Sequence, residues 1–500
     1  MPPTRGFLRS VITYCLPHSG GAGPCAPALT GPTGRGAETH RSVRIFPGTG
    51  DAGHPAPRPA CGTVTTRGTR IPADGTRAPP RGRGTETGRA GAVPGGGGRR
   101  APHRTRTVVD RFAAFQQELR SAPPHALVSV AAEHLHAWYG AGRVEVRMID
   151  YGMTSLQRVE NEAPGSDAVP VHDSAQGRAF GAQEPYPVCD VDGNVVVHLP
   201  LTIRGDRLGT VSIQLPDGAE VRPLLPKLRE VCEALGHEIV VAERDTDLFL
   251  LARRVTRLTL AAEMQWQLLP GRSCVRPEFE VGAHLEPAYA VFGDTFDWEA
   301  SDRYLTLSVT NGMGEGMDAA LLTSLAAGAL RNARRAGLDL AGQATLADQA
   351  VYAQHQGSAY VSVLLVRVEL ATGKVEVVDA GSPQMWRLRG GRTVERIDFD
   401  HQLPLGMFED TVYREEHFTV LPGDRLLLGS DGVYETPGAG GEKYGERALA
   451  RSLTANRLLP ASQVPVAILR ELADYRAERP LEDDALVMCL DWHGRPERDG

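Results

Sequence analysis

The sequence is poor in cysteine and aromatic residues, and it has no long apolar run. None of its seven cysteines belongs to a Cys-x-x-Cys pair. The odd number and the missing spacing disfavour a disulfide framework and a zinc site. No apolar run approaches the roughly 18 residues that cross a bilayer, and the first residues lack the apolar core of a signal peptide. We therefore expect a cytoplasmic protein that makes no membrane contact.

Charge is distributed unevenly along the chain. The net charge is −7, but residues 1–107 carry +12, with 16 arginines, 21 glycines and 15 prolines. Such a segment cannot bury enough apolar surface to offset its chain entropy, so we predict that residues 1–107 are disordered. An arginine-glycine arm could bind nucleic acid, but residues 77–106 contain no aromatic side chain, and we expect no nucleic-acid partner. Alternatively, translation begins near Val108.

Residues 108–245 combine helical and strand patterns. Apolar residues three and four apart predict helices over 108–120 and 125–138, with another helix from Leu224. Alternation predicts strands over 143–149, 195–203 and 208–215. These elements predict a compact α+β domain. Through the motif Gly177–Gly181, the strand at 197–202 and the turn Gly205–Thr210, the domain resembles GAF-type sensor domains, whose members bind small ligands or dimerise.

Seven residues before the next domain recur three and four positions apart. They are Leu248, Leu251, Val255, Leu258, Ala262, Gln265 and Leu269. This spacing predicts a helical linker over 246–270, ended by Pro270. The seam either packs one helix on a core or forms a coiled coil, through which we expect a homodimer. Gln265 would weaken such a seam but could fix its register.

Residues 271–493 alternate strand patterns with turns. Strands are predicted over 302–309, 359–368, 374–379 and 424–428, and a long apolar helix over 317–337. Acidic residues follow apolar runs at Asp294, Asp431 and Asp483, the first two beside glycine. Hard divalent cations prefer carboxylate oxygens, and a neighbouring glycine lets the backbone approach closely. One such acid usually marks only a turn, but three distant clusters could converge on one metal site.

The order of the motifs is more specific than any single motif. In chain order they are Leu268-Leu269-Pro270, Phe292-Gly293-Asp294, Asn311-Gly312-Met313-Gly314, Ala380-Gly381-Ser382, Pro404-Leu405-Gly406, Ser430-Asp431-Gly432 and Asp483-Asp484. This series resembles the metal-dependent serine/threonine phosphatases of the protein phosphatase 2C-like (PPM) type, in particular the bacterial SpoIIE-like branch that controls sigma factors. The resemblance covers about residues 255–493 and places a phosphatase domain at 271–493.

The resemblance implies a fold, a cofactor and a set of site residues. The fold is an α-β-β-α sandwich, in which helices flank two antiparallel sheets, within a chain of the α+β class. Two Mn²⁺ or Mg²⁺ ions in the cleft between the sheets would activate water for attack on a phosphoserine or phosphothreonine. Matched by motif, Asp294, Asp431 and Asp483 are the expected catalytic and metal-binding acids. Gly312 would offer a backbone carbonyl, and Asn311 completes the expected metal site.

One position departs from the pattern of the family. Asn311 stands where the family has an aspartate that bridges the two ions. An amide oxygen can bind a hard cation but brings no charge, so at least one ion should bind more weakly. Phe292 and Ser382 also replace the usual glycine and histidine. Asp484 and Asp297 are expected to support local structure instead of binding metal.

Two functions follow from this comparison. The first is a metal-dependent protein serine/threonine phosphatase under control of a sensor domain, acting on a phosphoprotein such as an anti-sigma factor antagonist. The second is a weak or inactive pseudophosphatase that serves as a signalling scaffold, because Asn311 replaces the bridging acid. Deamidation at Asn311-Gly312 would restore a carboxylate. The presence of Asp294, Asp431 and Asp483 favours the enzyme.

Overall fold

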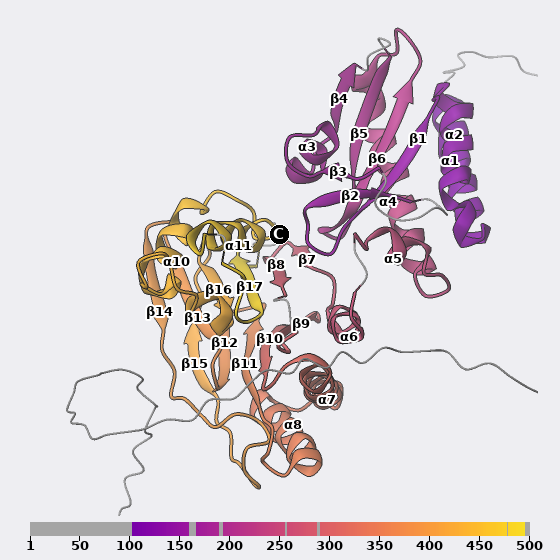
Figure 1. Ribbon diagram of the computed structural model, residues 1–500. Helices are drawn as coiled ribbons and strands as arrows, with labels where there is room; N and C mark the ends of the chain where they lie inside the picture. Colours follow the sequence, from indigo (N-terminus) through magenta and orange to yellow (C-terminus); the bar gives the residue numbers. More distant parts are fainter. Residues whose placement is uncertain are drawn as a thin grey trace, which may run out of the picture. The chain divides into compact units, whose positions relative to one another are not determined.

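The structure, a computed structural model, describes residues 103–159, 167–189, 194–255, 258–287, 291–477 and 479–495 (Figure 1). Residues 1–102 of the segment predicted to be disordered lie outside this range, and helix α1 begins at His103. In the part of the chain that is described, no helix combines the length and apolar character needed to span a bilayer.

The N-terminal domain is a six-stranded antiparallel sheet with helices packed on it. Its strands lie in the order β3-β2-β1-β6-β5-β4. They are β1 (Val144–Ile149), β2 (Ser155–Arg158), β3 (Val169–Pro170), β4 (Tyr186–Cys189), β5 (Val195–Ile203) and β6 (Asp206–Leu215). The helices are α1 (His103–Ser121), α2 (Leu127–Tyr139), α3 (Ala175–Ala182) and α4 (Val221–Ala242), and a short 3-10 turn (Pro124–Ala126) precedes α2.

One hydrophobic core holds this domain together. Helices α1, α2 and α4 contribute buried residues such as Phe115, Leu135 and Leu235, which pack with Val197 and Val211 of the central strands. The alternation along these strands places apolar side chains toward the helices, as the period of a strand requires. The predicted α+β organisation matches these elements, while the resemblance to GAF domains stays a prediction.

The linker is two short helices where one was predicted. Helix α5 covers Leu248–Ala252 and helix α6 covers Leu260–Leu268. The hydroxyl group of Thr259 accepts a hydrogen bond from the backbone N–H of Ala262, so a capped helix starts here. The prediction of one continuous helix is therefore wrong. The apolar residues keep their spacing from α5 into α6, so their pattern does not reveal where the helix is interrupted.

The C-terminal domain contains two antiparallel sheets. The five-stranded sheet has the order β15-β12-β11-β10-β9, and the six-stranded sheet has the order β14-β13-β16-β17-β8-β7. The first consists of β9 (Thr295–Ala300), β10 (Tyr304–Gly312), β11 (Val361–Glu369), β12 (Lys374–Ala380) and β15 (Glu416–Thr419). The second consists of β7 (Ser273–Arg276), β8 (Phe279–Glu286), β13 (Gln384–Arg389), β14 (Thr393–Ile397), β16 (Arg425–Gly429) and β17 (Ala485–Trp492).

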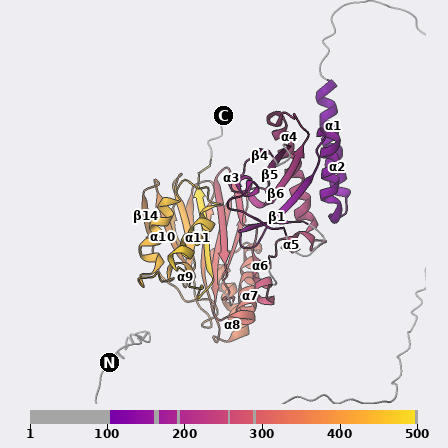
Figure 2. The ribbon, with the colours of Figure 1, turned by 45° about the horizontal axis from the view of Figure 1, so that its top comes forward.

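The two sheets pack face to face, and helices cover their outer faces. Phe296 and Leu307 from one sheet share a buried core with Leu428 and Met488 from the other. Helices α7 (Gly316–Arg335) and α8 (Leu340–His355) cover the five-stranded sheet, whereas α10 (Tyr444–Ala455) and α11 (Val464–Tyr475) cover the six-stranded sheet (Figures 1 and 2). The predicted α-β-β-α sandwich is confirmed.

Four strand ends meet at one edge of the sandwich. Strand β9 begins at Thr295, opposite the end of β10, where Thr295 pairs with Thr310. In the other sheet, β16 ends at Gly429, which pairs with Val487 near the start of β17. Because paired antiparallel strands end and begin at the same edge, the loops that carry the predicted acids emerge there. The one-turn helix α9 (Asp431–Tyr434) follows β16 directly.

Candidate metal-binding active site

The predicted acids converge at this edge although they lie far apart in the sequence. Asp294 precedes β9, Asp431 opens α9, and Asp483 precedes β17. Asp431 and Asp483 line the same cavity, and both act electrostatically on Asp294. Asn311, near the end of β10, donates a hydrogen bond from its Nδ2 to the Oδ1 of Asp431. The structure thus brings all the predicted side chains into one region.

Asp294 is the most unusual of these acids. Its side chain is 0% exposed. Neither carboxylate oxygen has a hydrogen-bond partner among the described residues. Burial, followed by the nearby Asp484, raises the pKa of Asp294 well above its usual range, although the hydroxyl group of Ser430 lies close enough to lower it in part. A buried carboxylate without partners is costly unless a proton or a cation neutralises it. This orphaned group is the strongest indication that a cation belongs here.

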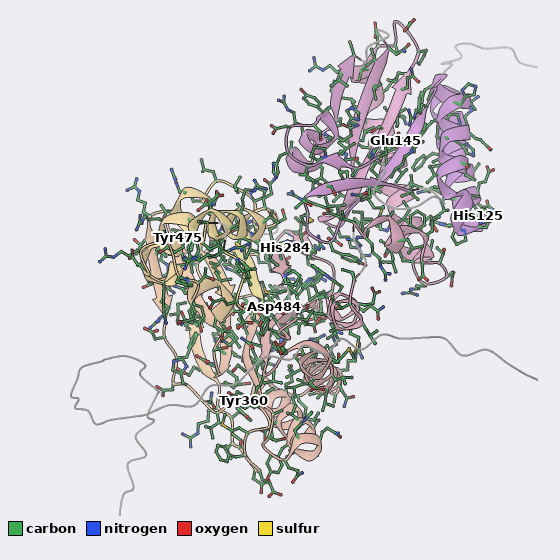
Figure 3. All side chains as sticks on the ribbon, in the orientation of Figure 1. His125, Glu145, His284, Tyr360, Tyr475 and Asp484 are labelled. Carbon is green, nitrogen blue, oxygen red and sulfur yellow. The ribbon has the colours of Figure 1, made fainter. Side chains whose placement is uncertain are left out.

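Asp484, labelled in Figure 3, has a different role, because its carboxylate is buried and accepts several hydrogen bonds. Its Oδ2 accepts hydrogen bonds from the backbone N–H groups of Phe292 at 3.0 Å, Gly293 at 3.2 Å and Asp294 at 3.4 Å. It also accepts one from the Nε2 of Gln265 at 2.7 Å. Asp484 therefore fixes the loop that presents Asp294, as a buried anion held by several donors.

Gln265 of α6 connects the linker to this loop. Besides bonding to Asp484, its Nε2 donates to the backbone carbonyl of Asp294 at 2.8 Å. The side chain is 2% exposed. The spacing of apolar residues placed Gln265 on a helical seam and did not predict this contact, since a local pattern carries no information about a partner 219 residues away. The only signal was a polar residue in an otherwise apolar series.

The remaining acids carry perturbed pKa values. Burial raises the pKa of Asp431. Burial, together with the charge of Asp431, raises the pKa of Asp483 to about 7. Like charges crowded in a partly desolvated place resist ionisation, and divalent cations relieve that repulsion. Asp297, by contrast, pairs with Arg331 at 2.9 Å and Arg334 at 2.8 Å, so it supports the local structure.

Two glycines are required for the close approach of these loops. A Cβ atom on Gly432 would lie 2.0 Å from the carbonyl oxygen of Asp484. Gly293 has a φ of +92°, and a Cβ atom there would lie 2.9 Å from the hydroxyl group of Thr323. That hydroxyl donates to the carbonyl of Gly293 at 2.8 Å. The Gly-Asp and Asp-Gly motifs are thus steric requirements of the site.

The donor chemistry fits a hard divalent cation, with one restriction. Asp294, Asp431 and Asp483 supply carboxylates, and Gly312 and Asn311 could supply a carbonyl and an amide oxygen. Among the described residues, however, no three His, Cys, Asp or Glu side chains are grouped closely enough to hold a metal ion. Asn311 also points its amide nitrogen at Asp431. A complete ligand set would therefore need oxygens from the amide and the backbone.

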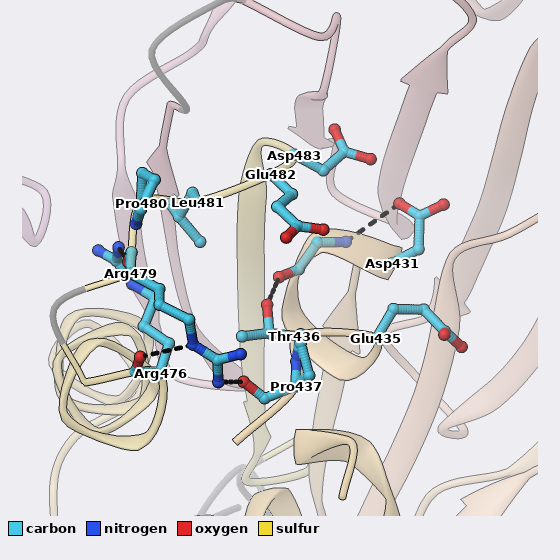
Figure 4. A pocket seen from close by; sticks show the side chains of 11 residues that line it. Asp431, Glu435, Thr436, Pro437, Arg476, Arg479, Pro480, Leu481, Glu482 and Asp483 are labelled. Atoms are coloured by element: carbon cyan, nitrogen blue, oxygen red, sulfur yellow. Dashed lines mark hydrogen bonds between the residues drawn. The ribbon is translucent and has the colours of Figure 1, made fainter. Parts of the chain in front are cut away.

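A cavity of about 360 Å³ opens beside the acids. Asp431 and Asp483 lie on one side of it, and Arg476 and Arg479 lie on the opposite side (Figure 4). The guanidinium of Arg479 donates to the carbonyl of Pro437, which belongs to the same wall. The cavity is large enough for an amino-acid side chain of a substrate next to the acids.

The α-β-β-α sandwich is the fold that the resemblance to the protein phosphatase 2C class implies. The family model of stage II sporulation protein E (SpoIIE) matches residues 301–493. This part of the chain is a SpoIIE-family domain, and the resemblance seen in the sequence is confirmed for it. A search of curated protein sequences gives no match.

Several solved structures are similar to part of the chain. The protein phosphatase 2C domain of SiaA from Pseudomonas aeruginosa is 22% identical, with a TM-score of 0.41 over 46% of this chain and 94% of that one. SpoIIE from Bacillus subtilis, with a fragment of its regulatory domain, is 14% identical, with a TM-score of 0.39 over 78% and 94%. RsbX, solved in complex with magnesium, is 13% identical, with a TM-score of 0.35 over 44% and 98%.

Proposed function

We propose that the chain is a metal-dependent protein serine/threonine phosphatase. Its substrate would be a phosphoserine or phosphothreonine on a regulatory protein, such as an anti-sigma factor antagonist, and the N-terminal domain would act as the sensor. The observation that carries the proposal is the buried carboxylate of Asp294, which has no hydrogen-bond partner and lies near Asp431 and Asp483. Such an arrangement is costly without cations, so it supports a site that is built to bind them.

Each residue has a distinct task in the proposed reaction. Asp294, Asp431 and Asp483 would hold Mn²⁺ or Mg²⁺, with help from the carbonyl of Gly312. When bound, the ions would activate water and neutralise charge on the phosphoryl group. Asp431 and Asp483 line the cavity, so a phosphoserine that entered it would lie beside them. No nucleophilic cysteine or serine of the protein is required.

The second candidate is a pseudophosphatase that signals by binding. It is favoured by one observation, the hydrogen bond from Asn311 to Asp431. An aspartate at position 311 would repel Asp431 and would call for a cation between them, whereas the amide satisfies Asp431 without one. Asn311 would have to turn its amide to offer oxygen to an ion. We therefore propose an enzyme that needs a high concentration of metal ion.

The proposed homodimer is supported by apolar surface near the linker. Leu251 is 46% exposed, Val255 47% and Leu260 66%. A second chain could cover these residues, which a solution measurement of molecular mass would test.

The cytoplasmic location stays a prediction.

The test is release of phosphate from a phosphoserine peptide by the full chain, with Mn²⁺ and with Mg²⁺. We expect metal-dependent release that Asp431→Asn abolishes. Asp474→Asn, which alters an exposed acid on α11, is the matched control and should keep the activity. Release that persists in Asp431→Asn would refute the proposed site. If the wild type releases no phosphate with either ion, the scaffold is the better interpretation.

A further inference from the structure

A second cavity lies in the N-terminal domain, remote in sequence from the phosphatase motifs. It has a volume of about 290 Å³ and lies among α1, α2 and α4. Arg111 and Phe112 line it from α1, Trp138 and Tyr139 from α2, and Lys227 and Val231 from α4. Figures 1 and 2 both show α1 and α2 side by side. The volume suits a small ligand, since binding cavities for small molecules start at about 300 Å³.

The floor and walls of this cavity are apolar and aromatic. Trp138 packs edge-on against Phe115, with ring centroids 5.4 Å apart, and contacts Tyr139 at 6.1 Å. Phe112 in turn lies 5.8 Å from Phe115. Phe115 is 0% exposed, so the cluster is anchored in the hydrophobic core. Aromatic rings held in this way form a preformed surface that binds an apolar body without much loss of side-chain freedom.

Two cations are among the residues that line the cavity. Arg111 and Lys227 are exposed, and neither side chain forms an ion pair or a hydrogen bond within the described part of the chain. Some other exposed arginines of this domain pair with acids, for example Arg143 with Glu145 and Arg229 with Glu184. Unpaired cations beside an aromatic cavity are free to bind an anion.

The other polar groups of the cavity leave its net charge positive. Glu230 is the one acid in its lining, against the two cations. Burial, followed by the charge of Glu230, raises the pKa of the Tyr139 phenol. Tyr139 therefore keeps its proton and can donate a hydrogen bond to a ligand. An anionic group would lie near Arg111 and Lys227, and Glu230, three residues after Lys227 on α4, is the acid that opposes it.

We propose that this cavity binds a small amphipathic anion. Its aromatic or aliphatic body would lie against Phe112, Trp138 and Val231, and its carboxylate or phosphate would be held by Arg111 and Lys227. Two cations against one acid in the lining favour an anion over a cation. The proposal is independent of the proposed phosphatase function, because no residue of the cavity belongs to the phosphatase domain.

The test measures binding to the full chain by calorimetry. The probes are indole-3-acetate, decanoate and octyl phosphate, each compared with a neutral analogue of the same body. We expect at least one anion to bind, its neutral analogue to bind at least tenfold more weakly, and its affinity to fall as salt rises. Arg111→Gln and Lys227→Gln should each weaken binding about fivefold, and the double variant about 20-fold.

The control is Arg229→Gln, which removes a cation from the same helix outside the cavity and should leave the affinity unchanged. Because Arg111 and Lys227 are exposed and unpaired, their variants should unfold at the wild-type temperature, which separates lost binding from lost folding. The proposal is overturned if none of the three anions binds. It is equally overturned if the double variant binds as the wild type does, or if the neutral analogues bind as tightly as the anions.

Discussion

Replacing Gly432 by alanine should both destabilise the phosphatase domain and impair its binding of divalent ions. A Cβ atom at this position would lie 2.0 Å from the carbonyl oxygen of Asp484 and 2.8 Å from its carbonyl carbon. Because Cβ atoms in proteins keep at least 3.0 Å from such atoms, the two segments must separate by about 1 Å. The separation would draw Asp431 away from Asp483.

The size of the effect follows from two opposing contributions. Overpacking against backbone atoms costs about 1–3 kcal/mol, and more where neither segment can yield. Alanine recovers up to about 1 kcal/mol over glycine in a helix such as α9. The net loss of roughly 2 kcal/mol corresponds to a fall of about 4–8 °C in the unfolding midpoint. A shift of about 1 Å among catalytic groups can also lower the rate about 100-fold.

Thermal unfolding with and without Mn²⁺ is the direct assay. Gly440→Ala is the matched control, since a Cβ atom there meets nothing within 4 Å. We expect Gly432→Ala to unfold several degrees below that control and to gain less stability from Mn²⁺. If both variants unfold at the same temperature and respond equally to the ion, the close contact between the two acidic loops does not exist.

Two further predictions concern the same region. Gln265→Ala would leave the buried Asp484 with one donor fewer, at a cost of about 1–3 kcal/mol. The unfolding midpoint of this variant should therefore fall well below that of Gln267→Ala, which alters an exposed residue of the same helix. Equal midpoints in the two variants would contradict the contact. In protein without metal, the folded state keeps a proton on Asp483 up to a pKa of about 7, whereas an unfolded chain releases it near 4. Stability should therefore decrease as pH rises from about 4 to about 7. Asp483→Asn should reduce this decrease, and an identical pH dependence in both proteins would show that Asp483 is not perturbed.

The sequence predicted those parts of the fold that depend on local pattern and motif order. The strand predicted over 424–428 is the fully buried β16, and the helix predicted over 317–337 is α7. The resemblance carried by the order of the motifs implied the sandwich and the convergence of the acids. Strands such as β2 and β3 escaped prediction, because elements of four and two residues are too short to show a period.

The contacts that determine the chemistry of the site were beyond the reach of local pattern. Asn311 was recognised as a substitution, but its hydrogen bond to Asp431 depends on loops that meet only in the folded chain. The bond from Gln265 to Asp484 and the burial of Asp294 depend on tertiary packing in the same way. The motifs therefore pointed to residues that the structure brings into one region, while the structure shows which of them lack a partner.

The central claim is that this edge binds divalent ions in spite of Asn311. Phosphate release from a phosphoserine peptide, measured against Mn²⁺ concentration for the wild type and Asn311→Asp, tests it most directly. We predict activity in both proteins. The Mn²⁺ concentration that gives half-maximal activity should be lower for Asn311→Asp, by up to about tenfold, because a carboxylate adds charge that an amide lacks. Activity in Asn311→Asp alone would contradict the claim and would identify the wild-type chain as a pseudophosphatase.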